Sequence, residues 1–443
     1  MSREIVLDIL IEVMEKEAFG HLVIRQALDK YAYLEKRDRA FITRLANGTM
    51  ERAIELDALI DSFSAVKTKK MRPVIRNILR MTAYQIKYME SVPDSAACNE
   101  AVKLAKKRGF HKLADFVNGV SRSISRGLAD YEPPKEFSVR YSMPQWIVSM
   151  WIKQYGKEKT EQILKEFLKE DHTKETIVRC NQSRKPVEHI VDSLLDQNVT
   201  VMRDKILPYA LHISGYDRLE TLEAFQKGWI QVQDISSMLV GEAAKPAKGS
   251  FCMDVCAAPG GKSLHLADMM ENQGIVESRD LTWEKVSLIQ ENCHRCEFSC
   301  ITPISWNAEE LDLKKVAKAD VVIADLPCSG LGIIGNKPDI KYKMTEEKME
   351  SLVMLQRSIL KTIQQYVKPG GILIYSTCTI HKGENEDNVK WFLEQFPFQT
   401  VPLQGQCWET VDCTTGEKGY CQILPKAGYH SGFFISKFQK GRE

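Results

Sequence analysis

The sequence predicts a multidomain protein with an all-α N-terminal domain, a small α/β module and a C-terminal doubly wound α/β domain. Three observations predict this order. Apolar residues recur at helical spacing through the first 128 residues, with few strand or hairpin signals. Short β-like segments then flank one helical segment. From about residue 231, apolar strands alternate with helices, which is typical of a parallel sheet covered on both faces.

The length of 443 residues, with 44% hydrophobic and 27% charged residues, suits two or three domains. No run of 18 or more apolar residues and no signal-like start are present, so we expect a cytoplasmic protein with no membrane partner. In that setting the twelve cysteines are expected to be thiols rather than a disulfide framework. We expect the chain to act as a monomer.

Residues 1–130 form the predicted helical domain, in which the segment 93–109 is typical of a helix that begins at Pro93 and Asp94 and ends at Gly109. The pair Pro133-Pro134 cannot lie inside a helix, so residues 131–168 are predicted to be a linker followed by further helices. Residues 169–228 are the predicted small module. Its strand-like segments are "ETIVRC", "VTVMR" and "ALHIS", which flank the helical segment "PVEHIVDSLLDQ".

The net charge of +2 is unevenly distributed. Residues 1–130 hold 23 Lys and Arg against 17 Asp and Glu, whereas the remainder holds 38 against 42. Two basic clusters favour a polyanion such as RNA, although solvated helix faces would give the same pattern. They comprise Lys67, Lys69, Lys70, Arg72, Arg76, Arg80 and Lys87, and then Lys103, Lys106, Lys107, Arg108, Lys112, Arg122 and Arg126.

In the predicted C-terminal domain, residues 229–443, the strand "FCMDVC" leads into the turn "AAPGGKS". Gly260 and Gly261 there permit a close backbone approach, so a ligand is expected over the carboxyl ends of the strands. The dinucleotide pattern G-x-G-x-x-G is absent, which disfavours hydride transfer. The turn instead resembles the S-adenosylmethionine loop of class I methyltransferases, in the form found in RNA 5-cytosine methyltransferases.

Polar side chains follow the other predicted strands. Asp280 ends "GIVESRD", about twenty residues past the glycines, where a carboxylate can accept hydrogen bonds from both ribose hydroxyls. Asn307 follows the third strand, where such methyltransferases usually have an Asp, and its amide can pair with the adenine edge. Cys328 follows "DVVIAD" and Cys378 follows "GILIYST".

Methylation of cytosine at carbon 5 gives two cysteines a use. One thiolate must add to carbon 6 to make carbon 5 nucleophilic, and a second group must help to break the adduct afterwards. Asp325, three residues before Cys328, is suited to act as the acid at cytosine N3. The spacing of the residues does not decide which cysteine attacks.

The whole constellation resembles the RsmB/Sun (Fmu) family of bacterial 16S ribosomal RNA 5-cytosine methyltransferases. The motifs that carry this resemblance are "RDRAFITRLANGTMER", "FVNGVSRSISR", "VQDISSMLV", "DVCAAPGGKSLH", "DLPCSGLGIIGNKPDIKY", "YSTCTIHKGENEDNV" and "SGFFISKF". The resemblance implies Cys378 as nucleophile and Cys328 as the residue that aids product release. It implies S-adenosylmethionine as cofactor, bound by Asp280, Asn307, Asp325 and the loop residues Cys256, Ala257, Ala258, Pro259, Gly260, Gly261 and Lys262.

The resemblance further implies a NusB-like RNA-binding N-terminal domain, a ferredoxin-like module, a Rossmann-like methyltransferase domain, and 16S ribosomal RNA or a small-subunit assembly intermediate as partner. One departure is Ser431, where the family commonly has an Asp. Cys293, His294, Cys296 and Cys300 look like a metal cluster, but helical spacing accounts for them and we expect no metal. The alternatives are a non-catalytic RNA-binding assembly factor, a 5-cytosine methyltransferase for another RNA, or an enzyme acting on DNA or a small molecule.

Overall fold

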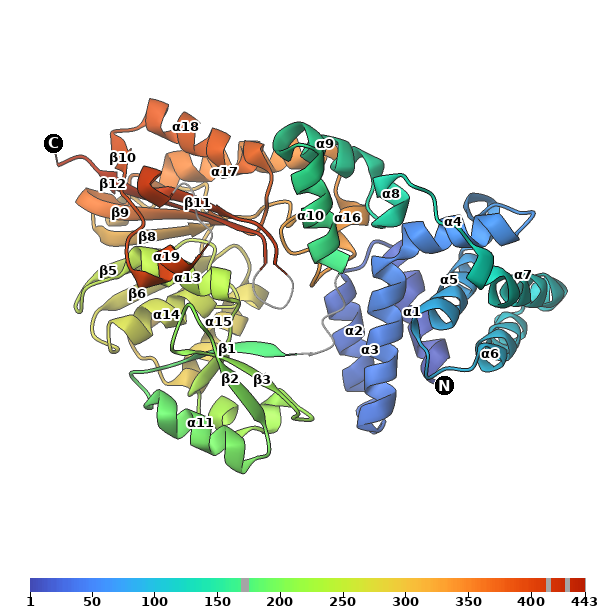
Figure 1. The fold of residues 1–443 in the computed structure, drawn as a ribbon. Helices are drawn as coiled ribbons and strands as arrows, with labels where there is room; N and C mark the ends of the chain where they lie inside the picture. The colour runs from blue at the N-terminus through green and yellow to red at the C-terminus, as the bar shows by residue number, and fades with distance from the viewer. Residues whose placement is uncertain (169–174, 412–415, 427–430, 443) are drawn as a thin grey trace. The chain divides into compact units, whose positions relative to one another are not determined.

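The structure, a computed structural model, describes residues 1–168, 175–411, 416–426 and 431–442 (Figure 1). It divides into two compact units, residues 1–169 with 334–344, and residues 170–333 with 345–443. The predicted start of the small module at residue 169 lies outside the described residues. Segment 334–344, which the sequence patterns assign to the C-terminal domain, groups instead with the N-terminal helices.

The first unit is helical throughout its described residues, as predicted. Helix α5 is central, because it packs against α1, α3, α4, α6 and α7 and buries Ile75, Ile78 and Leu79 among them. The helices of this unit are α1 (Ser2–Glu15), α2 (Gly20–Lys30), α3 (Lys36–Glu51), α4 (Ala53–Phe63), α5 (Pro73–Tyr88), α6 (Asp94–Lys107), α7 (Ala114–Gly127), α8 (Phe137–Arg140), α9 (Gln145–Tyr155), α10 (Lys157–Leu168) and α16 (Ile340–Lys343).

Buried polar contacts explain why segment 334–344 belongs to this unit. Lys341 is 1% exposed, and its ammonium donates to the carbonyl oxygens of Glu51 and Ser142, each at 2.6 Å. Burial lowers the pKa of Lys341 to about 7. Asp339, which is also buried, accepts a hydrogen bond of 3.1 Å from the backbone N–H of Gly20. Because Lys341 and Asp339 are buried, water does not compete for these hydrogen bonds. The hydrogen bonds therefore hold the segment in the first unit.

The second unit begins with a four-stranded antiparallel sheet of order β2-β3-β1-β4. Its elements are β1 (Thr176–Cys180), α11 (Val187–Asp196), β2 (Thr200–Arg203), β3 (Ala210–Ser214), α12 (Glu223–Gln226) and β4 (Ile230–Val232). This β-α-β-β-α-β order is ferredoxin-like, as the resemblance implies. Strand β4 lies beyond residue 228 and was not predicted, because three residues are too few to show an alternating pattern.

The large sheet has the order β10-β12-β9-β8-β5-β6-β7, with β11 paired to β12. Its strands are β5 (Phe251–Asp254), β6 (Ile275–Asp280), β7 (Ile301–Ser305), β8 (Ala319–Asp325), β9 (Val367–Thr377), β10 (Phe398–Thr400), β11 (Tyr420–Ile423) and β12 (Phe433–Lys440). Strands β5 to β9 pair in parallel, as expected. The sheet is mixed rather than wholly parallel, because β12 pairs antiparallel with β9, β10 and β11.

Helices cover both faces of this sheet (Figure 1). Along β8, Val321 and Ile323 join the core that includes Leu264 of α14, whereas Val322 and Ala324 join the core beneath α17 and α18. This alternation is the period of two that a strand buried on both faces requires. The helices of this part are α13 (Ile235–Ala244), α14 (Gly261–Met269), α15 (Trp283–Cys296), α17 (Glu346–Ile363), α18 (Glu386–Gln395) and α19 (Gln406–Thr410).

The ferredoxin-like module shares a hydrophobic core with the large sheet, since Val178 of β1 and Leu211 of β3 belong to the same buried cluster as Leu264. The module is therefore packed onto the large sheet within the second unit. No helix in the described ranges is both long and apolar enough to span a membrane.

Candidate active site

The carboxyl ends of β5, β6, β8 and β9 bring the predicted site residues to one edge of the large sheet. Strands β5 and β8 are neighbours although β6 and β7 lie between them in sequence, so the chain order reverses between them. Ligands of open α/β sheets bind at such a reversal. The loop 256–262 follows β5, Asp280 ends β6, Asp325 ends β8, and Cys328 and Cys378 lie just beyond β8 and β9.

The loop after β5 is fixed to the end of β6. Ala257 donates its backbone N–H to the carbonyl oxygen of Arg279 at 2.8 Å, and Ala258 donates its N–H to Oδ2 of Asp280 at 3.0 Å. Gly260, at the start of α14, has φ +103°, a backbone conformation in which a side chain would be strained. The loop therefore requires a glycine at position 260 for its backbone conformation. This conformation places backbone N–H groups beside Asp280.

Asp280 is 5% exposed and retains acceptor capacity. Its Oδ1 accepts from the N–H of Leu281 at 2.8 Å and from the ammonium of Lys285 at 2.9 Å. A carboxylate has about four acceptor positions, and the Lys285 side chain is half exposed and can turn to solvent. Asp280 can thus accept hydrogen bonds from a ligand above the loop.

Asn307 is half-buried after β7, and its amide is used within its own turn. Oδ1 accepts from the N–H of Glu309 at 3.1 Å, and Nδ2 lies 3.4 Å from Oε1 of Glu310. Each atom keeps one further position for a ligand, because an amide oxygen can accept two hydrogen bonds and an amide NH2 group can donate two.

Lys262 points into the site. Its Nζ lies 2.6 Å from Oδ2 of Asp325, and it sits over the ring of Phe433. Burial alone would lower the pKa of Lys262, but the attraction of Asp325 outweighs burial and raises it. Ser376 donates to the other oxygen of Asp325 at 2.7 Å. The Asp325 carboxylate is held by two partners, and Lys262 is not an ordinary surface lysine.

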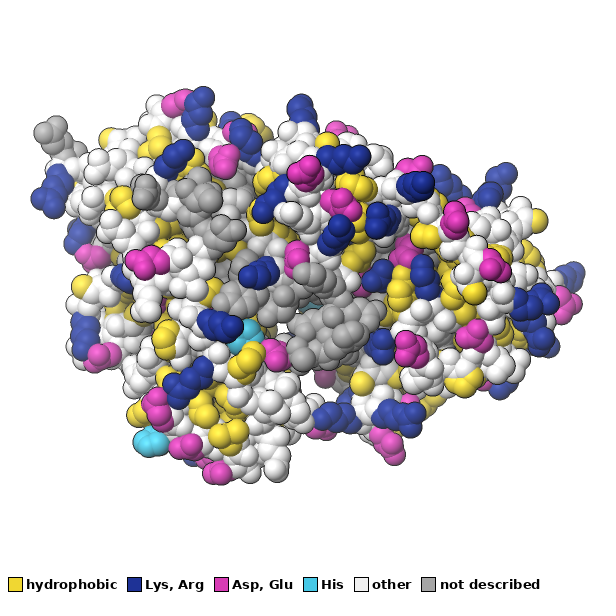
Figure 2. Space-filling model, in the orientation of Figure 1, with side chains coloured by type: hydrophobic (Ala, Val, Ile, Leu, Met, Phe, Trp, Pro, Cys, Tyr) yellow, Lys and Arg dark blue, Asp and Glu magenta, His cyan; other side chains and the backbone are white. Residues whose placement is uncertain are grey.

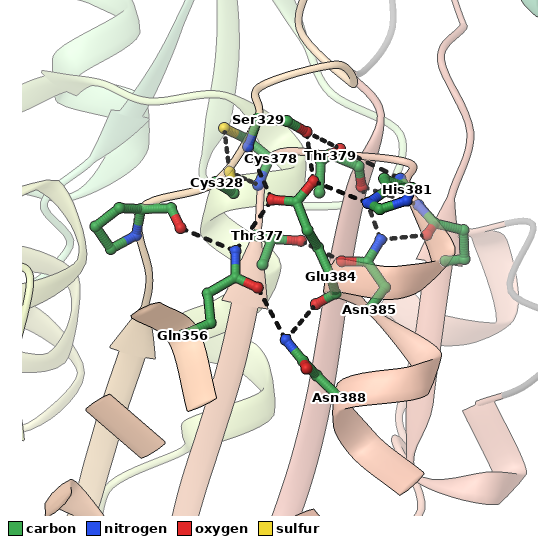
Figure 3. Close-up of polar contacts among 12 residues, drawn as sticks. Cys328, Ser329, Gln356, Thr377, Cys378, Thr379, His381, Glu384, Asn385 and Asn388 are labelled. Atoms are coloured by element: carbon green, nitrogen blue, oxygen red, sulfur yellow. Dashed lines mark hydrogen bonds and ion pairs between the residues drawn. The ribbon is translucent and has the colours of Figure 1, made fainter. Parts of the chain in front are cut away.

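The two predicted cysteines meet. Cys328 Sγ and Cys378 Sγ are 3.2 Å apart, and the backbone N–H of Cys378 points to Cys328 Sγ at 3.3 Å (Figure 3). The hydrogen bond with Cys378, burial, and the neighbouring charges of Cys378 and Glu384 raise the pKa of Cys328 well above its usual range. Cys328 therefore keeps its proton at neutral pH and can donate it to the other sulfur.

The loops that carry the cysteines are packed without space between them. Gly332 donates its N–H to the carbonyl oxygen of Cys378 at 3.1 Å and accepts from the N–H of Gly432 at 2.8 Å. A Cβ on Gly332 would lie 2.0 Å from the carbonyl oxygen of Gly432. Next to it, Ser431 donates to Oδ2 of Asp234 at 3.1 Å, so an Asp at position 431 would face another carboxylate. Ser431, the residue that departs from the family pattern, thus forms a favourable local contact with Asp234.

Sequence analysis missed Arg179 of β1, a buried residue. Its guanidinium donates to the carbonyl oxygen of Gly261 at 2.9 Å, to Gln233 at 2.7 Å and to Asn181 at 2.6 Å. The ferredoxin-like module therefore holds the start of α14 directly. No sequence signal marks Arg179, since the contact joins residues 82 positions apart.

Glu384 is the second residue that the patterns did not reveal. It lies in the polar run "KGENED", which is typical of a solvated surface, yet its side chain is fully buried. Its carboxylate accepts hydrogen bonds beside Cys328 (Figure 3). The position of Glu384, six residues after Cys378, is a weak sequence signal by itself. Only the tertiary structure shows that Glu384 lies beside the cysteines.

The cysteine-rich segment of α15 packs into the protein. Cys293 and Cys296 are buried in the hydrophobic core, and burial raises the pKa of Cys293 to about 12. Within the described ranges, no three His, Cys, Asp or Glu side chains are grouped so that they could hold a metal ion. Of the eleven cysteines in the described ranges, ten carry free thiols as expected, whereas Cys421 of β11 is disulfide-bonded, so the expectation of thiols is wrong for Cys421.

The two basic clusters are partly neutralised inside the first unit. Arg76, Arg80 and Lys87 pair with Glu15, Asp57 and Glu55, and Lys103, Lys107 and Arg108 also meet acids. Basic and acidic side chains accordingly mix over the helices in Figure 2. The exposed basic residues for which the structure shows no acidic partner in the described chain are Lys67, Lys69, Lys70, Arg72, Lys106, Lys112, Arg122 and Arg126.

Three family models match the chain in order. They are the NusB family over residues 1–126, the ferredoxin-like domain of RsmF/B-like methyltransferases over 143–218, and the 16S rRNA methyltransferase RsmB/F over 242–439. The probable ribosomal RNA small subunit methyltransferase B of Bacillus subtilis (strain 168) is 35% identical over 99% of this chain and 98% of its own. The same-named protein of Synechocystis sp. is 31% identical over 99% of both chains.

Solved structures give the same fold. The crystal structure of PH0851 has a TM-score of 0.83 and 25% identity over 99% of both chains. NSun6 from Pyrococcus horikoshii has a TM-score of 0.60 and 21% identity, over 68% of this chain and 99% of its own. The fold and the strand-end site define a Rossmann-like methyltransferase. The chain belongs to the RsmB/F family of 16S rRNA methyltransferases, an rRNA small-subunit methyltransferase family.

Proposed function

We propose that the protein transfers a methyl group from S-adenosylmethionine to carbon 5 of a cytosine in 16S ribosomal RNA, through a covalent adduct between Cys378 and carbon 6. The observation that carries this proposal is the 3.2 Å approach of Cys328 Sγ and Cys378 Sγ at the ends of neighbouring strands. A pair of thiols in contact suits a reaction that needs one sulfur to add and a second group to assist elimination.

The residues of the loop after β5 fit S-adenosylmethionine. Asp280 would accept from the ribose hydroxyls, and the backbone between Cys256 and Gly261 together with Lys262 would hold the methionine end. When bound, this cofactor would supply an electrophilic methyl group on a sulfonium, whose methyl–sulfur bond would break as the bond to carbon 5 forms, so that S-adenosylhomocysteine leaves. The half-buried ion pair joins Lys262, at the end of the loop, to Asp325, three residues before Cys328, so the cofactor and the cytosine would meet at Asp325.

Cys378 is the nucleophile in this proposal. Its Sγ adds to carbon 6 of the cytosine, and the electron pair of the carbon 5–carbon 6 double bond moves to the incoming methyl carbon. Once protonated, Asp325, which Lys262 and Ser376 orient, would donate its proton to N3 during the addition and take it back when Cys378 leaves. The proton on carbon 5 then passes to Cys328 as Cys328 gives its own proton to the departing sulfur, which restores the double bond and frees Cys378 as a thiol.

Cys328 assists this last step. The raised pKa of Cys328 keeps a proton within hydrogen-bond distance of the departing sulfur, which suits a residue that shuttles protons during elimination. The cytosine must lie in a loop or be extruded, since its ring face has to meet Cys378. The exposed basic residues of the first unit would bind the surrounding phosphates.

Substitution of each cysteine tests the proposal. Cys378→Ala removes the nucleophile, so the variant should neither methylate 16S rRNA nor attach to it. Cys328→Ala should still add to the base and should accumulate a protein–RNA complex that survives denaturing electrophoresis. Bisulfite sequencing of the RNA reports the methylated cytosine.

Cys300→Ala is the matched control, because Cys300 is a half-buried thiol before β7, away from the site. It should behave as the unsubstituted protein. A stable complex with Cys378→Ala in place of Cys328→Ala would reverse the two roles. Full activity in both variants would remove covalent catalysis and leave another methylation chemistry, whereas an unsubstituted protein that binds RNA without methylating it would be an RNA-binding assembly factor.

A further inference from the structure

Glu384 is a buried carboxylate in the 3-10 turn Lys382–Glu384, between β9 and α18. Its side chain is 0% exposed, and in the described chain no lysine or arginine pairs with it. Burying such a charge costs several kcal/mol unless hydrogen bonds replace its hydration. The residues that donate these hydrogen bonds therefore show which part of the protein the carboxylate keeps in place.

Those donors belong to the residue after Cys328. Ser329 donates its backbone N–H to Oε2 of Glu384 at 2.8 Å and its hydroxyl to Oε1 at 2.5 Å (Figure 3). Gln356 of α17 donates its side-chain N–H to Oε2 at 3.0 Å and also to the carbonyl oxygen of Pro327 at 2.9 Å. The residues on both sides of Cys328 are thus tied to Glu384, directly or through Gln356.

The same network reaches the residue after Cys378. The hydroxyls of Ser329 and Thr379 lie 2.8 Å apart, and Nδ1 of His381 lies 3.3 Å from Oε1 of Glu384. Asn385 donates to the carbonyl oxygen of Thr379 at 3.0 Å and accepts from the hydroxyl of Thr377 at 2.6 Å. Residues that follow the two cysteines are therefore joined across the gap between β8 and β9.

We infer that Glu384 is a positioning residue that holds the Cys328 loop against the Cys378 loop and so sets the distance between the two sulfurs. Glu384 touches neither sulfur and no reacting atom. What the sulfur pair does rests on the proposed function, whereas the positioning itself concerns only this chain. The charge of Glu384 also favours the thiol form of Cys328, which agrees with the proposed division of roles.

The distance between the sulfurs can be measured without RNA or cofactor. The full chain is equilibrated with reduced and oxidised glutathione, whose exchange converts two thiols and one oxidised glutathione into one protein disulfide and two reduced glutathiones. Alkylation, digestion and mass spectrometry then give the fraction with a Cys328–Cys378 disulfide, and hence the effective concentration of one thiol at the other.

Glu384→Ala should lower this effective concentration about tenfold or more, because the buried N–H of Ser329 loses its partner and the loop relaxes. Glu384→Gln keeps the reach and one acceptor oxygen, and should lower it about threefold. The Gln variant decides the matter if the Ala variant does not fold. In methylation assays both variants should lose kcat with little change in the affinity for the cofactor.

Val389→Ala is the matched control, since Val389 is a buried residue of α18 that packs in the core beneath the sheet. It should reduce stability and leave the effective concentration unchanged. An unchanged value in folded Glu384→Ala, or an equal fall in Val389→Ala, would overturn the inference. Loss of the proposed RNA chemistry would leave this thiol equilibrium intact, so the two failures are distinguishable.

Discussion

At the scale of single residues, Asp254 shows how the site is built on unfavourable burial. It ends β5 and is fully buried; Oδ2 accepts from Ser263 at 2.7 Å, and Oδ1 has no hydrogen-bond partner among the described residues. Burial raises the pKa of Asp254 to about 7, although Ser263 and Lys262 oppose the shift. The folded protein therefore binds a proton that the unfolded chain releases.

A raised pKa of a carboxyl group stabilises the fold below the unfolded pKa, and this stability is lost as the pH rises through the folded pKa. For Asp254 the window runs from 3.8 to about 7. Asp254→Asn removes this loss while its oxygen can still accept from Ser263. Urea unfolding should show the variant gaining on the unsubstituted protein by on the order of 2 kcal/mol between pH 5 and pH 8. A difference that stays constant with pH would contradict it.

The site residues that sequence analysis identified are those whose position follows from a strand end. Asp280, Cys328 and Cys378 fall there, and parallel strands bring their carboxyl ends together. Arg179 and Glu384 could not be found in this way, because their partners lie 82 and 55 positions away in sequence. Buried polar residues are defined by tertiary hydrogen bonds rather than by periodicity.

At the scale of elements, the loops that carry the two cysteines depend on direct backbone contact as well as on the side chains around Glu384. Gly332 is in van der Waals contact with Gly432, whose carbonyl oxygen would stand 2.0 Å from any added Cβ. The hydrogen bond between Gly332 N–H and the carbonyl oxygen of Cys378 needs this approach. The strand ends are predictable from sequence, but the tight loop packing between them is not.

Gly332→Ala should therefore separate the loops, lowering stability by about 1–3 kcal/mol and kcat about tenfold or more. Gly119→Ala in α7 is the matched control, because nothing lies within 4 Å of its added Cβ. It should be neutral or slightly stabilising, as removal of a helical glycine usually is. Thermal unfolding and single-turnover methylation measure both effects. Equal behaviour of the two alanine variants would contradict the steric argument.

At the scale of the whole molecule, basic residues that are free to bind RNA have to be distinguished from basic residues that pair with acids of the protein. Sequence counts made the N-terminal part look strongly basic, but Arg80 pairs with Asp57 at 2.6 Å and Arg76 with Glu15 at 2.6 Å. These acids lie outside the cluster from Lys67 to Lys87, so a count within that cluster misses them. Deletion of residues 1–130 would also uncover Lys341, which donates to Glu51. Point substitutions are the better test of RNA binding.

The exposed residues Lys69, Lys70 and Arg72 offer that test. Replacing all three with Glu should weaken binding to 16S rRNA and reduce the slope of log affinity against log salt by about three. The control replaces Lys318, Lys361 and Lys390, exposed residues of the second unit, with Glu and makes the same change in net charge. Filter binding at several salt concentrations measures both. Equal slopes in the two variants would make Lys69, Lys70 and Arg72 ordinary surface residues.

The packing of segment 334–344 in the first unit has a consequence for the order in which the parts of the protein fold during synthesis. Domains generally fold from the N-terminus as the chain leaves the ribosome. Here the first unit lacks a buried part until residue 344 has emerged, by which point strands β5 to β8 are already outside. Until then, water must hydrate the carbonyl oxygens of Glu51 and Ser142, because Lys341, which donates hydrogen bonds to both, has not yet been synthesised. The amino-terminal helices are thus the first to be synthesised, yet they can reach their final packing only after four of the eight strands of the large sheet have been translated.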